Sequence, residues 1–116
     1  MALSDMEKKL KHFGGRDIAV ELIDIFLESY KENQTSVRKA INDNNAVLLN
    51  TSAHAFKGML SHFCDQCARL AYQLEVIGGT GKIDLESANA AYDNLKMAVD
   101  QLVRKLKEYK RRFESQ

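Results

Sequence analysis

The chain has 116 residues and a mass of 13.1 kDa, which predicts one domain over residues 1–116 with a single hydrophobic core. Hydrophobic residues make up 45% and charged residues 28%, and the net charge of +1 gives no field that would attract nucleic acid or an anionic membrane. No apolar run approaches the roughly 20 residues that span a bilayer, and the N-terminus does not read as a signal peptide. Two cysteines three residues apart make no disulfide framework, so we expect a reducing, cytoplasmic location.

The N-terminal residues predict a short helix that stops at a pair of glycines. Ser4 and Glu7 have the spacing of a capping box, so a helix is expected from Ser4 to about His12. Gly14-Gly15 then ends it. The chain contains no proline, so no residue forces a break in the longer helices that follow.

A long helix is expected next. From Arg16, apolar residues recur at helical spacing to around Asn33. A further helical stretch, which holds Val37 and Ile41, either continues this helix or follows a slight kink. Residues 42–45 read Asn-Asp-Asn-Asn and predict a turn.

The segment after that turn holds two of the three histidines and both cysteines. Asn45 is expected to cap a helix that starts near Ala46 and carries the sequence HAFKGMLSHFCDQC, residues 54–67. This helix either breaks near Cys64, with Asp65 capping the next helix, or runs on.

A further apolar run and a last long helix complete the chain. The run 70–77 ends at Gly78-Gly79-Thr80-Gly81, and Asp84 is expected to cap a helix whose apolar side extends to Tyr109. No window alternates with period two over a convincing length. We therefore predict an all-α fold: an antiparallel up-down four-helix bundle with a short extra N-terminal helix and a core from about residue 6 to 107.

Helical phase divides the segment 54–67 into an inner and an outer face. His54 lies opposite the apolar arc, roughly 140–160° from its middle. Gly58 costs about 0.5–1 kcal/mol relative to alanine in a helix interior, so its place one turn after His54 indicates that another surface approaches the imidazole. Close packing inside the bundle is the alternative explanation, and the position of Gly58 on the polar face argues against it. The expected inner residues are Leu49, Ala53, Phe56, Leu60, Phe63 and Cys67, and the residues around His54 are Asn50, Thr51, Lys57, Gly58 and Ser61.

The residues around His54 resemble a known family. His54-Ala55-Phe56-Lys57-Gly58 is similar to the H-x-(L/F)-K-G signature of histidine-containing phosphotransfer (HPt) domains. The resemblance covers the chain from about Met6 to Lys107 and includes the segments 12–17, 22–27, 68–71 and 74–75. The chain departs from the family pattern just after the signature: Met59 and Leu60 are bulky where the family has small residues, and Cys64 replaces a glycine.

The resemblance implies a phosphorelay intermediate. HPt domains accept a phosphoryl group from an aspartyl phosphate on a receiver domain and pass it to another receiver. By this resemblance His54 is the phosphoryl acceptor, Lys57 attracts the phosphoryl oxygens and Gly58 provides clearance for the partner. The surface that faces the partner is expected to include Asn50, Thr51 and Ser61, any of which could hydrogen-bond the ring, the phosphate or the partner.

The partners implied are response-regulator receiver domains, with a hybrid sensor kinase as a further candidate. The chain itself binds no cofactor by this resemblance, and Mg²⁺ belongs to the receiver. No nucleotide-binding glycine loop and no acidic cluster on the His54 face are visible, so the chain is expected to be a phosphocarrier rather than an enzyme. A bundle with one polar active face suggests a monomer. The main alternative is a docking bundle without phosphotransfer, although such a module need not keep His54, Lys57 and Gly58 together.

His62, Cys64 and Cys67 are candidates for a metal or redox site. On a continuous helix His62 and Cys67 point roughly 140° apart, and a fourth ligand is missing, so no metal site is expected. A thioredoxin-like Cys64-x-x-Cys67 needs a βαβ setting, and no strand is visible. We expect the cysteines to be packing residues.

Two further patterns are given structural explanations. The run 78–82, Gly-Gly-Thr-Gly-Lys, lacks the spacing of a phosphate loop and is expected to be a helix stop followed by a flexible connection. The basic residues of 104–112 suit a nucleic-acid or lipid patch less well than a solvated helix terminus.

Overall fold

The computed structural model describes residues 5–114 and the side chains of residues 6–113, so Ser4 of the predicted capping box lies outside the described residues. Within this range the chain is helical and contains no strand. The elements are α1 (Asp5–Leu10), the 3-10 helix η1 (Lys11–Phe13), α2 (Arg16–Asn42), α3 (Ala46–Leu60), α4 (Asp65–Gly79) and α5 (Leu85–Glu114).

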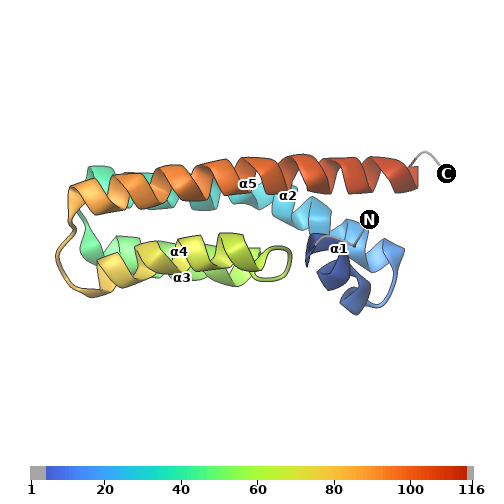
Figure 1. Cartoon of the computed structure of the whole chain (residues 1–116), viewed down its shortest axis with the longest axis horizontal. Coiled ribbons are helices and arrows are strands. Elements are labelled where there is room, and N and C mark those ends of the chain that lie inside the picture. Colours follow the sequence, from blue (N-terminus) through green and yellow to red (C-terminus); the bar gives the residue numbers. More distant parts are fainter. Residues whose placement is uncertain (1–4, 115–116) are drawn as a thin grey trace.

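Helices α2 to α5 form an antiparallel four-helix bundle. Each helix packs on the next one in sequence, and α5 returns to pack on α2. The long α2 and α5 run side by side, the shorter α3–α4 hairpin covers one part of their length, and α1 lies toward the other end (Figure 1). The predicted bundle with a short extra N-terminal helix is therefore confirmed. No helix in the described range has the length and apolar character needed to cross a bilayer.

Helix α2 extends beyond the apolar stretch that was expected to end around Asn33. It continues without a break to Asn42, so the stretch that holds Val37 and Ile41 is part of the same helix. Its buried side chains recur at helical spacing and keep one face against the core. Two predicted caps flank the hairpin. The Asn45 side chain accepts a hydrogen bond from Leu48 N at 3.0 Å, and the Asp84 carboxylate accepts bonds from Ser87.

The helix that carries His54 does not run on through the cysteines, and it ends four residues before Cys64. Helix α3 stops at Leu60, and a turn leads to Cys64, which is the N-cap of α4. The prediction that Asp65 caps α4 is wrong. Asp65 is the first residue of α4, and the Cys64 sulfur accepts the capping hydrogen bond from Cys67 N at 3.1 Å. Phe63 and Cys67 are buried as expected, but they lie on the turn and on α4.

The core follows the apolar faces of all five α-helices. Among the described residues no polar or charged residue is buried as a whole, although the side-chain oxygen of Gln34 is a buried atom without a hydrogen-bond partner. Phe26 is fully buried, with its ring 5.5 Å from that of Tyr30 and 5.1 Å from that of Phe63. The largest fully buried side chains are Phe26, Phe56, Leu10, Ile23, Ile41, Leu49, Leu60, Leu74, Leu95, Leu106, Val37 and Val99.

The N-terminal helix is tied to the start of α4. Lys9 Nζ lies 2.8 Å from Asp65 Oδ1, and the ring of Phe13 lies 6.4 Å from that of Phe63. Between η1 and α2, Gly14 and Gly15 have φ angles of 86° and 143°, a region that side chains rarely adopt, so glycine permits this sharp connection.

Candidate functional site

His54 stands on the outer face of α3. Its side chain is 68% exposed, while Leu49, Ala53 and Phe56 on the opposite side of the helix are fully buried. The division follows from the helical repeat, which places the buried residues on one arc and turns His54 away from it.

A carboxylate on the neighbouring helix binds this histidine. Glu75 Oε1 lies 3.1 Å from His54 Nδ1 and 2.9 Å from Lys57 Nζ. One oxygen from α4 therefore holds two side chains that are one turn apart on α3. Glu75 was absent from the residues that the sequence singled out for the site. The antiparallel hairpin is the signal that could have located it, because a turn at 61–64 brings the middle of α4 opposite His54.

The carboxylate fixes which ring nitrogen is available. A carboxylate can only accept hydrogen bonds, so His54 Nδ1 carries the proton in this contact. In the neutral ring Nε2 then holds the free lone pair. Since the ring is largely exposed, this nitrogen is a nucleophile that a second molecule can reach.

The ion pair keeps Glu75 charged. The hydrogen bond from the Lys57 ammonium is the main cause that lowers the pKa of Glu75, and the bond from His54 acts in the same direction, against desolvation. The carboxylate is thus anionic at neutral pH and can stabilise positive charge on either partner.

Lys57 is held between two groups of α4. Besides its bond to Glu75, its ammonium lies 5.0 Å from the centre of the Tyr72 ring. The side chain is 28% exposed, so the charge faces the same surface as His54 without being fully solvated.

Gly58 leaves open space beside His54. It is exposed, and a Cβ at this position would have no neighbouring heavy atom within 4 Å. Close packing inside the chain therefore does not explain this glycine, and the clearance it gives is on the outside of α3.

The side chains of the three remaining polar residues hydrogen-bond to backbone carbonyls rather than to the ring. Thr51 Oγ1 and Ser61 Oγ donate to backbone carbonyls of α3, at 3.1 Å to Val47 and 2.8 Å to Gly58. Asn50 Nδ2 donates to the carbonyl of Glu75 at 2.8 Å. Asn50 therefore helps to fix the position of Glu75 along α3. Thr51 and Ser61 are exposed on the same helix as His54.

A close approach of the two helices supports this geometry. Gly78 is buried in α4, and a Cβ there would lie 2.5 Å from Asn50 N and 2.7 Å from Ala46 O. The run 78–82 is thus more than a helix stop, because Gly78 and Gly79 are helical and Gly78 allows α3 and α4 to touch.

Apolar side chains surround the polar centre. Val47 is 75% exposed on α3, and Tyr72 and Val76 are exposed on α4, either side of Glu75 in sequence. Val47 precedes His54 by two helical turns and so lies on the same face of α3. The site is therefore a small polar centre within a partly apolar surface.

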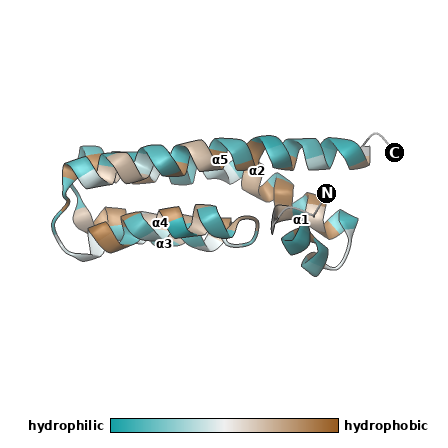
Figure 2. Ribbon diagram, in the orientation of Figure 1, coloured by the Kyte–Doolittle hydropathy of each residue, from teal (hydrophilic) through white to brown (hydrophobic). Residues whose placement is uncertain are grey.

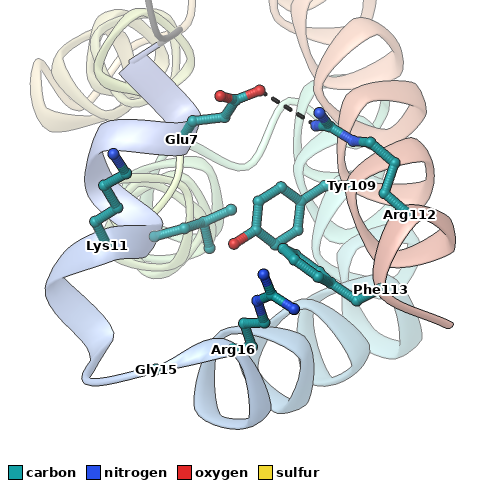
Figure 3. Close-up of a pocket in the computed structure, with 8 residues that line it drawn as sticks. Glu7, Lys11, Gly15, Arg16, Tyr109, Arg112 and Phe113 are labelled. Carbon is teal, nitrogen blue, oxygen red and sulfur yellow. Dashed lines mark hydrogen bonds and ion pairs between the residues drawn. The ribbon is translucent and has the colours of Figure 1, made fainter. Parts of the chain in front are cut away.

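The opposite end of the molecule carries a cavity of about 490 Å³ between α1, η1 and the end of α5 (Figure 3). Its lining includes Arg112, which pairs with Glu7 at 3.2 Å, and no residue of the His54 site. The end of α5 is mostly hydrophilic (Figure 2). Lys110 pairs with Asp24 at 2.6 Å, so part of this basic end is used within the bundle.

His62 lies on the turn before the two cysteines and next to an aromatic ring. The His62 ring lies 6.1 Å from that of Phe13, and no group of three or more His, Cys, Asp or Glu side chains among the described residues is placed to hold an ion.

The chain has the fold of a histidine-containing phosphotransfer protein. It matches the crystal structure of histidine-containing phosphotransfer protein B (HptB) from Pseudomonas aeruginosa PAO1 with a TM-score of 0.85, over 96% of this chain and 98% of that one. The two sequences are 22% identical. No family model and no curated protein matches the chain. The likeness thus establishes the fold, and the chemistry of the site rests on its own geometry.

Proposed function

We propose that the protein is a phosphorelay intermediate in two-component signalling. His54 accepts a phosphoryl group from the aspartyl phosphate of a receiver domain and passes it to another receiver. The observation that carries this proposal is the contact between His54 Nδ1 and Glu75, which leaves Nε2 free on an exposed face.

The transfer requires little from this chain beyond positioning. Nε2 of His54 attacks phosphorus, the bond from phosphorus to the aspartyl oxygen breaks, and the receiver regains its carboxylate. The Nδ1 proton stays on the ring, so the phosphorylated imidazole carries a positive charge next to the Glu75 carboxylate. Reverse transfer to a second receiver uses the same contacts.

Lys57 supplies positive charge for the transferred group. Its ammonium is one helical turn from His54 and is bound to Glu75 at 2.9 Å. A phosphoryl group on Nε2 adds negative charge to this surface, and Lys57, whose ammonium lies over the Tyr72 ring, can attract it as a point charge.

The receiver would dock over the exposed face of α3 and α4. Gly58 offers room beside the imidazole, and the exposed Val47, Tyr72 and Val76 offer apolar contact area. Asn50, Thr51 and Ser61 would lie at this interface. A hybrid sensor kinase is a candidate donor, and Mg²⁺ and the phosphorylated carboxylate would belong to the receiver. In this role the chain is a cytoplasmic, monomeric phosphocarrier, a co-substrate without a kinase core.

Phosphotransfer from a charged receiver tests the proposal. A receiver domain labelled with radioactive phosphate, with Mg²⁺ present, should transfer acid-labile label to the wild-type protein and none to His54→Gln. His62→Gln is the matched control, since His62 is also exposed but stands on the turn after α3, and it should accept label normally. Labelling of His54→Gln at the wild-type level would refute the assignment. Binding of receivers without any transfer would favour a docking bundle.

A further inference from the structure

The two cysteines lie together at the start of α4, and phosphotransfer uses neither of them. Cys64 is the N-cap of this helix and Cys67 stands in its first turn. Both are free thiols, Cys64 half-buried and Cys67 buried. The sequence favours a packing role because no βαβ unit surrounds them. The structure nevertheless places a C-x-x-C pair at a helix N-terminus, where reactive thiols are found in other folds.

The Cys64 sulfur already points at Cys67. It accepts the hydrogen bond from Cys67 N at 3.1 Å. Residues three apart on a helix have Cβ atoms about 5–6 Å apart, and a disulfide needs about 3.5–4.5 Å. The N-cap has an extended backbone, with φ −157° and ψ 107°, and follows a short turn, so the remaining movement falls on that turn.

The surroundings favour a thiolate at Cys64 and a thiol at Cys67. The hydrogen bond from Cys67, with backbone N–H groups of the first turn and the charge of Lys105 on α5, lowers the pKa of Cys64 to about 6 against the effect of burial. The hydrogen bond with the Cys64 side chain, together with burial, raises the pKa of Cys67. From α1, Lys9 pairs with Asp65 and so balances the carboxylate next to Cys64.

A small cavity reaches the pair. It has a volume of about 130 Å³ and lies between the start of α4 and α5, with Cys64, Cys67, Gln101 and Lys105 in its lining. A small oxidant such as a hydroperoxide can therefore approach the two sulfur atoms from this side.

We propose that Cys64 and Cys67 are a redox-active dithiol, which a small hydroperoxide oxidises to an intramolecular disulfide. This inference stands on the geometry at the start of α4 and does not depend on the function of His54.

The reaction proceeds in two balanced steps. The Cys64 thiolate attacks one oxygen of the peroxide, the O–O bond breaks, and a sulfenic acid and hydroxide (or alkoxide) form. The Cys67 thiol then attacks the sulfenic sulfur, the S–O bond breaks, and water leaves with the thiol proton. Both cysteines are oxidised by one electron each, and the peroxide takes up both electrons.

The reduced state has its own stabilisation. A Cys64 thiolate is a strong acceptor for the N–H groups at the start of α4, and the neutral disulfide sulfur is a weak one. Stabilising the reduced form makes a couple more oxidising, so we expect the disulfide to be reduced readily by a small thiol.

Mass spectrometry of the reduced full-length protein treated with hydrogen peroxide tests this inference. The wild type should lose the mass of two hydrogen atoms, remain monomeric on a non-reducing gel, and recover its mass with dithiothreitol. Cys67→Ser should instead give a sulfenic acid at Cys64 that dimedone traps. Cys64→Ser should leave Cys67 unreacted under the same conditions.

Alkylation of the wild type gives a second readout that needs no variant. In the folded protein the alkylation rate at Cys64 should reach half its maximum near pH 6. In the protein unfolded by urea the half-maximum should move to above about pH 8, as for an ordinary cysteine. Oxygen addition at Cys64 without loss of hydrogen in the wild type, disulfide-linked dimers, or the same alkylation profile with and without urea would each overturn the proposal.

Discussion

One carboxylate oxygen organises the residues of the site. Glu75 Oε1 accepts from both His54 and Lys57, although the two are three residues apart and come from a different helix. Through one contact it sets the tautomer of the imidazole, and through the other it holds the ammonium beside it. The anionic Glu75 puts negative charge next to the imidazole, so the site tolerates the positive charge that a phosphorylated ring would carry.

Glu75→Gln separates the charge of this side chain from its shape. The amide keeps the size of the carboxylate but loses its charge, and its NH₂ group can donate to Nδ1 and so stabilise the wrong tautomer. The loss of a charge-assisted bond to the ring is worth about 1.4 kcal/mol, so we expect phosphotransfer to His54 to slow about tenfold. Rapid-quench transfer from a labelled receiver measures the rate.

Asp93→Asn is the matched control for that experiment. Asp93 is exposed on α5, so the same carboxylate-to-amide change there should leave the rate unchanged. If Glu75→Gln transfers as fast as Asp93→Asn, then Glu75 does not position or charge-stabilise the ring.

At the scale of helices, two glycines have opposite roles. Gly58 lies in α3 with open space around it, and Gly78 lies in α4 against the backbone of α3. Both are helical, so both carry the conformational cost of glycine in a helix. Within the chain only Gly78 has a packing reason for that cost, and a reason for Gly58 must come from outside it.

Alanine at each glycine should therefore change stability in opposite directions. Gly58→Ala should raise the free energy of unfolding by about 0.5–1 kcal/mol, since its methyl group meets nothing. Gly78→Ala should lower it by about 1–3 kcal/mol, because its Cβ would lie 2.5 Å from Asn50 N and push the helices apart. Urea unfolding followed by far-UV circular dichroism measures both, and equal signs would contradict this account.

For the whole molecule, periodicity was sufficient to predict the architecture. Apolar residues at helical spacing, the Asn45 and Asp84 caps and the absence of proline predict the bundle, and the structure matches it. The exposed position of His54 follows from the phase of one helix alone. These features depend on residues near each other in sequence, which is why a single sequence reveals them.

Features that depend on contacts between helices could not be predicted in this way. The bond from His54 to Glu75 depends on the rotation of α4 about its own axis, and the role of Gly78 depends on the distance between α3 and α4. The cap at Cys64 was missed because sulfur is an unusual capping acceptor, and Asp65 offered a better one next to it.

The stability of the whole fold should report the charge of Glu75. Its pKa lies below the ordinary value of 4.5, so its ion pair stabilises the folded state above that pH and is lost as the pH falls through the lowered value. Because Lys57 and Glu75 are partly exposed, we expect a difference of at most about 1 kcal/mol between wild type and Glu75→Gln at pH 7. In urea unfolding well below pH 4.5 the two proteins should become equally stable. A difference that persists in acid would mean that Glu75 stabilises the bundle by packing, and that its charge acts only on the chemistry of His54.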